Sequence, residues 1–142
     1  MVELALIILP VALLVFSAID VGRMAHVQNR LANAAREGSA VAQMTPGWVA
    51  EGCHGDQNIS AAIIREDPKL PGYDGFTIKV ETADGTPITG CEDDPAGMLG
   101  IQPGDRIIVR VSARVNMTTP LTGAVLGDPK TLTRTIEVVV QG

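Results

Sequence analysis

The sequence predicts an α+β protein in which a long N-terminal helix packs, by its C-terminal half alone, on a small antiparallel sheet. Three observations lead to this fold class. Residues Leu4 to Ile19 carry no charge, and after Asp20 no strong helix breaker occurs before Thr45-Pro46-Gly47. Beyond Pro46 the hydrophobic period falls from three or four residues to two, which is the period of a strand with one buried face. We therefore expect a helix over 1–44 and a β-rich head over 45–142.

Charge and hydropathy divide at the same boundary. The chain has 142 residues, 46% of them hydrophobic, and a net charge of −5. Residues 1–44 contain three basic and three acidic side chains, so the other 8 basic and 13 acidic residues give the head all of the net charge. An acidic chain of this kind is not expected to bind nucleic acid, because phosphate recognition needs clustered Lys and Arg.

The first half of the predicted helix, residues 1–22, is almost uniformly apolar. As a transmembrane helix its uncharged stretch rises about 24 Å, short of the roughly 30 Å hydrocarbon core unless Glu3 and Asp20 lie at the interfaces. A cleavable signal peptide should begin with basic residues, yet the first cation is Arg23. A third interpretation makes this half an assembly segment that sits in the membrane first and later packs against copies of itself.

The second half, residues 23–44, is amphipathic and is expected to cover the sheet. A narrow apolar stripe recurs at spacings of three and four residues: Met24, Val27, Leu31, Ala34, Gly38 and Val41. A continuous helix to Met44 would be about 63 Å long. A head of fewer than a hundred residues cannot bury all of it, so part must contact lipid or other subunits. Pro10, Gly22 and Gly38 are expected to be soft places in this helix.

The head shows three strand patterns and one short helix. Residues 76–80, 107–115 and 131–141 alternate apolar with polar side chains or are β-branched, and turn residues separate them. A helix over 59–66 would start at Asn58 as N-cap and stop at Asp67-Pro68. An antiparallel sheet with one apolar face needs a cover, which the stripe of the long helix supplies.

Nothing in the sequence has the pattern of an active site, and we expect no enzyme, cofactor or metal. His26 and His54 are the only imidazoles, and the cluster of Cys53, His54 and Asp56 is weak evidence for a metal. There is no phosphate-binding glycine loop and no nucleophile motif.

Two covalent features are expected instead. Cys53 and Cys91 are predicted to form a disulfide, because an exported chain with two cysteines most often pairs them. Asn58 and Asn116 begin short patterns that match the N-glycosylation acceptor, which also arises by chance.

Particular segments resemble the TadE-like pilins of tight-adherence type IV pilus systems. The resemblance is carried by residues 1–10 (MVELALIILP), 16–23 (FSAIDVGR) and 28–38 (QNRLANAAREG), and more loosely by 119–123 before the final strand. It implies a type IV pilin-like fold, cleavage by a prepilin peptidase, export across the cytoplasmic membrane and assembly by an ATPase-driven machine. In type IV pilins the usual glutamate is the fifth mature residue, whereas Glu3 is the third residue here.

These observations favour a structural pilin that polymerises into an extracellular filament for adhesion or surface attachment, after residence in the cytoplasmic membrane. The residues expected to carry assembly are Glu3, Leu4, Leu6, Ile7, Pro10, Leu13, Leu14 and Phe16. One alternative is a minor TadE-like pseudopilin that primes or caps a filament of another protein. A second is a membrane-anchored module whose β head binds a ligand.

Overall fold

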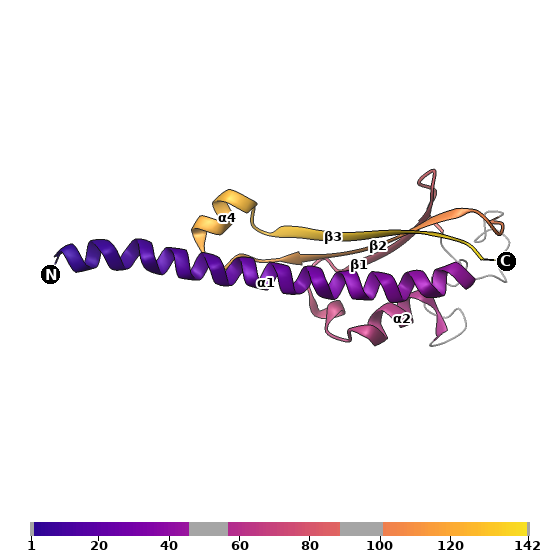
Figure 1. Ribbon diagram of the computed structural model, residues 1–142, viewed down its shortest axis with the longest axis horizontal. Coiled ribbons are helices and arrows are strands. Elements are labelled where there is room, and N and C mark those ends of the chain that lie inside the picture. Colours follow the sequence, from indigo (N-terminus) through magenta and orange to yellow (C-terminus); the bar gives the residue numbers. More distant parts are fainter. Residues whose placement is uncertain (1, 46–56, 89–100, 142) are drawn as a thin grey trace.

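The computed structural model describes residues 2–45, 57–88 and 101–141 (Figure 1). In chain order the elements are α1 (Val2–Met44), α2 (Ile59–Glu66), the 3₁₀ turn η2 (Leu70–Gly72), β1 (Thr77–Thr82), β2 (Arg106–Val115), α4 (Pro120–Leu126) and β3 (Lys130–Val139). Figure 1 shows the N-terminal half of α1 projecting by itself from a head built around its C-terminal half. The predicted fold class is confirmed.

The sheet has three antiparallel strands in the order β1-β2-β3. In the central strand β2, every second side chain from Ile107 to Val115 is buried, as the alternation predicts. Val80 of β1 pairs with Val109, and Val109 pairs with Ile136 of β3, so apolar residues continue across all three strands on the inner face. This face forms the wall against which the helix packs.

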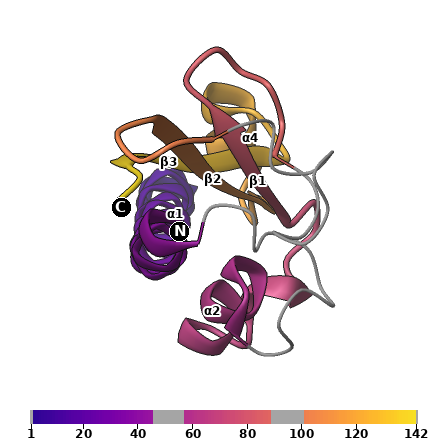
Figure 2. The ribbon, with the colours of Figure 1, turned by 90° about the vertical axis from the view of Figure 1, so that its right-hand side faces the viewer.

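The C-terminal half of α1 lies between the sheet and α2 and contacts both (Figures 1 and 2). Of the predicted stripe, Val27, Leu31 and Ala34 are buried in one hydrophobic core with the inner residues of the sheet. Two polar contacts fix the helix along β3 and the residues that follow this strand. Arg134 of the strand donates to Gln28 Oε1 at 3.2 Å, and the Gln141 amide donates to the Gln43 carbonyl at 2.8 Å.

Helix α2 begins and ends where the sequence predicts. The Asn58 side chain accepts a hydrogen bond from the Ala61 amide at 2.7 Å, and Asp67 is the C-cap. The helix packs closely on α1 at Gly38, where an added Cβ would lie 2.6 Å from the side chain of Ile63. Gly38 is therefore a point of close contact between the helices, whereas the sequence predicted only a soft place there.

Candidate assembly surface and its junction with the head

The apolar half of α1 is left uncovered by the rest of the chain. Its large hydrophobic side chains are between 36% and 74% exposed: Leu4, Leu6, Ile7, Ile8, Leu9, Val11, Leu13, Leu14, Val15, Phe16 and Ile19. Glu3 and Pro10 are also exposed. All the residues expected to carry assembly thus lie on one uncovered segment, which we call the assembly surface (residues 3–19).

The assembly surface belongs to a helix that is long and apolar enough to cross a membrane, judged by length and composition. The helix continues through Pro10 without interruption. Ser17, one of the few polar residues in this half, donates its hydroxyl to the Leu13 carbonyl at 2.7 Å, so its polar group is satisfied within the helix. The segment therefore presents apolar side chains to whatever surrounds it.

At the end of the assembly surface, the carboxylate of Asp20 fastens the C-terminal part of the head to α1. Asp20 is only 2% exposed. Its oxygens accept from the amides of Thr118 and Thr119 at 2.9 to 3.1 Å, and from the hydroxyls of Thr119 and Thr122 at 2.7 Å. Four donors on one buried carboxylate make this junction the boundary between the covered and uncovered halves of α1.

The donors come from the segment that leads into α4. Thr119 has extended backbone torsions before Pro120, the first helical residue, and Gly127 ends the helix with φ +87°. Figure 1 shows α4 lying over α1 toward the projecting half. Val125 of α4 is strongly exposed, so this helix adds an apolar side chain to the head near the junction.

Arg23 lies one turn after Asp20 and is the first cation of the helix. Its side chain is 54% exposed, and one of its Nη atoms is 3.8 Å from Asp20 and donates to the Thr118 hydroxyl at 2.6 Å. Only one hydrogen bond from this guanidinium is made within the described residues, so the other donors of the exposed side chain stay available.

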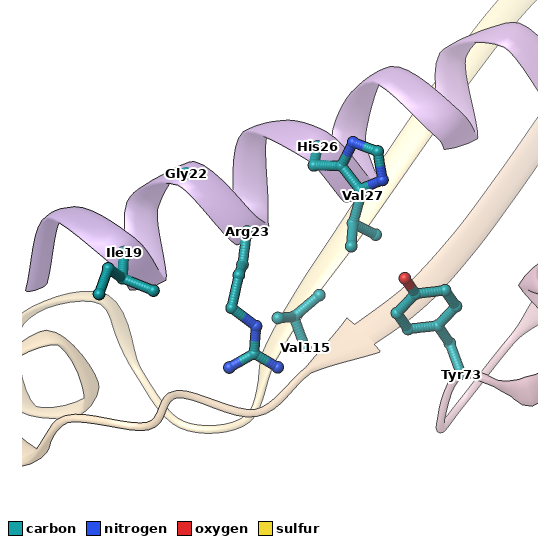
Figure 3. A pocket seen from close by; sticks show the side chains of 7 residues that line it. All are labelled: Ile19, Gly22, Arg23, His26, Val27, Tyr73 and Val115. Carbon is teal, nitrogen blue, oxygen red and sulfur yellow. The ribbon is translucent and has the colours of Figure 1, made fainter. Parts of the chain in front are cut away.

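A cleft of about 420 Å³ opens beside Arg23 at the junction (Figure 3). In Figure 3, Arg23 and Val27 extend from α1 toward Val115, and the hydroxyl of Tyr73 points toward the helix. The full lining is Ile19, Gly22, Arg23, His26, Val27, Tyr73 and Val115. The cleft thus combines apolar walls with cationic or neutral polar groups and has no carboxylate in its lining.

A second polar contact holds α1 to the segment after α2. The guanidinium of Arg30 pairs with both oxygens of Asp67, and it donates to the Tyr73 hydroxyl at 2.8 Å. The guanidinium carbon also lies 5.3 Å from the centre of the Tyr73 ring. Hydrogen bonding from Arg30 holds the pKa of Asp67 below its usual range, which stabilises the charged pair.

The other predicted residues have different outcomes. Cys53, Cys91, His54 and Asp56 lie outside the described residues, so the disulfide stays a prediction. Asn58 is 1% exposed and caps α2, whereas Asn116 is exposed, and glycosylation of either residue stays a prediction. His26 is exposed at the cleft. Within residues 2–45, 57–88 and 101–141, no three His, Cys, Asp or Glu side chains are grouped to hold a metal ion.

Sequence reasoning missed the contact of Asp20 with the threonines and the helix α4. The contact joins residues 98 to 102 positions apart, which local patterns do not detect. Signals for α4 were nonetheless present. Thr119 before Pro120 is a helix start, and Gly127 is a helix stop.

Comparison with known proteins supports the resemblance of the N-terminal segment. Residues 1–40 match the family model described as TadE-like protein. No curated protein and no solved structure matches the chain significantly. The match covers the assembly surface, Asp20, Arg23 and most of the stripe that packs on the sheet. The head beyond residue 40 lies outside this match.

Proposed function

We propose that this TadE-like protein is a structural subunit that polymerises through its assembly surface into an extracellular, Tad-like type IV pilus used for adhesion or surface attachment. The observation that carries the proposal is the uncovered apolar half of a 43-residue helix, fixed to a folded head at Asp20. Fully burying one large aliphatic side chain is worth about 1.5 to 3 kcal/mol relative to water. A surface of ten such residues and Phe16 is stable only in lipid or against other subunits.

The same surface serves both environments in turn. Before assembly it lies in the cytoplasmic membrane, where lipid covers the apolar side chains. In the filament, helices of neighbouring copies replace the lipid, and small residues such as Ala12 and Ala18 permit close helix approach. The subunit does not need to refold between these states, because the head is held by contacts on the other half of α1. The family implies two partners: a prepilin peptidase that processes the subunit and an assembly ATPase that drives its transfer into the filament.

A minor pseudopilin that primes or caps a filament is the second candidate. The family match ends at residue 40 and concerns the segment that either kind of subunit would use. Abundance separates the two. A structural subunit is the main protein of sheared filaments, whereas a minor one is present in a few copies per filament.

The proposal is tested on filaments sheared from cells that express the full chain. N-terminal sequencing and quantification should find this chain as their main component. A variant that lacks residues 4–19 should be absent from filaments and should be recovered in the soluble fraction as a monomer. Incorporation of the deletion variant at the normal level would refute the proposal. Monodisperse monomers in detergent with no filaments under any condition would favour a membrane-anchored binding module instead.

A further inference from the structure

The cleft at the junction lies at one end of the assembly surface, beside the exposed side chain of Arg23, and an exposed carboxylate, Glu3, lies at the other end. Gly22 contributes no side chain to the cleft, and a Cβ added there would meet nothing within 4 Å. Ile19, Val27 and Val115 form apolar walls. Arg23 and His26 are both exposed at its edge. A group that fills this space should therefore be partly apolar and should carry negative charge.

Glu3 is the acid at the other end of the assembly surface. It is exposed, and no hydrogen bond or ion pair within the described part of the chain involves it. A carboxylate enclosed among apolar helices is costly unless it meets a cation or a strong donor. In a polymer of one chain, that cation must come from the sequence of the chain itself.

Three arginines lie on α1, and their surroundings separate them. Arg30 is engaged by Asp67 and Tyr73. Arg36 lies well inside residues 23–44, the half of α1 that packs on the head, and so it is far along the helix from the assembly surface. Arg23 follows the assembly surface, and although it pairs with Asp20 at 3.8 Å and donates to Thr118, its side chain is 54% exposed and keeps unused donors. It is thus the arginine of α1 best placed to meet a carboxylate that arrives at the junction.

We propose that the cleft receives the N-terminal turn of α1 from a second copy of this chain, with Glu3 of that copy paired to Arg23. The inference rests on the proposed function. It also fixes the offset between the two copies, because positions 3 and 23 are separated by twenty residues, or about 30 Å of helix. Since both residues belong to one continuous helix, Glu3 cannot reach the Arg23 of its own chain. Contact between them is therefore always a contact between copies.

The first test is photo-cross-linking within filaments assembled from the full chain. A benzophenone amino acid replaces His26 at the edge of the cleft, and the matched control carries the same probe at Ala40, which is exposed near the other end of α1. The His26 probe should capture the N-terminal peptide that contains Glu3, and the Ala40 probe should not. The inference would be overturned if the His26 probe captured other peptides but not the N-terminal one. It would also be overturned if both probes captured the N-terminal peptide equally.

The second test is a double-mutant cycle on filament yield. Glu3→Gln and Arg23→Gln should each lower the yield about tenfold, the scale of a lost charged hydrogen bond. If the residues pair, the filament yield of the double variant should be no lower than that of the single variant with the lower yield. Glu3→Gln combined with Arg36→Gln is the control, and its effects should multiply. Multiplying effects for Glu3 and Arg23 would overturn the inference, as would an unchanged yield for Arg23→Gln.

These outcomes are distinct from failure of the proposed function. If the unmodified chain is not a component of filaments, the proposed function is wrong. If filaments contain the chain but show neither the N-terminal cross-link nor the coupling, only the pairing of Glu3 with Arg23 is wrong. Glu3 would then have another partner, such as a terminal amine of a neighbouring subunit.

Discussion

Two glycines on α1 have opposite surroundings, and alanine substitution should therefore have opposite effects on stability. At Gly22 an added Cβ meets nothing within 4 Å, so Gly22→Ala keeps the full gain in helix propensity, about 1 kcal/mol. At Gly38 the Cβ would lie 2.6 Å from two atoms of Ile63, which is completely buried and has little room to move. Overpacking of this kind costs about 1 to 3 kcal/mol. Gly38→Ala should therefore be neutral or destabilising by up to about 2 kcal/mol.

The assay is thermal unfolding of the full chain in detergent, which covers the assembly surface equally in both variants. One kcal/mol corresponds to about 3 °C in Tm for a chain of this size. Gly22→Ala should raise Tm by about that amount, and Gly38→Ala should leave it unchanged or lower it. Shortening the neighbour in Gly38→Ala/Ile63→Val removes the contact with Cδ1 and should reduce the penalty. Equal rises in Tm for the two single variants would refute close packing of α1 on α2.

Three further predictions concern assembly, the junction and pH. Leu6 and Met44 are 74% and 75% exposed at opposite ends of α1. Leu6→Ala removes about 2 kcal/mol of burial free energy per subunit. After filaments are pelleted, the subunit concentration in the supernatant should therefore rise roughly thirtyfold, whereas Met44→Ala should change it little. Asp20→Ala should lower Tm more than Asp20→Asn, because an amide oxygen can still accept from some of the four donors. Because its pKa is lower in the folded than in the unfolded chain, Asp67 stabilises the fold above its ordinary pKa near 3.8. The stability of the unmodified chain should decline as pH falls below that value, and the stability of Asp67→Asn should decline less steeply. Equal dependence of stability on pH in the two proteins would contradict the ion pair with Arg30.

Local patterns were sufficient to predict much of the fold. The alternation from Ile107 to Val115 and the apolar stripe of the long helix each reflect burial of one face, and periodicity reports burial directly. Asn58 was correctly predicted as an N-cap, because the cap bonds an amide only three residues away.

The junction could not be predicted in the same way. Asp20 closes the apolar run in sequence and looks like an interfacial charge, yet its partners are a hundred positions away on the approach to α4. Arg30 and Asp67 are 37 positions apart and meet only because α2 folds back on α1. Such contacts depend on how distant segments meet in the folded chain, and local sequence patterns do not report this.

The most direct test of assembly through residues 3–19 is a reconstruction of shed filaments by electron cryo-microscopy, at a resolution that traces side chains. We expect residues 3–19 of this chain to form the helical interior of the filament, in contact with other copies, while the sheet and α2 lie on the outside. Copies in contact through the cleft should be offset by about 30 Å along the axis. Filaments that lack this chain, or that contain it with residues 3–19 exposed on the outer surface, would contradict the claim that this half of α1 is an assembly surface.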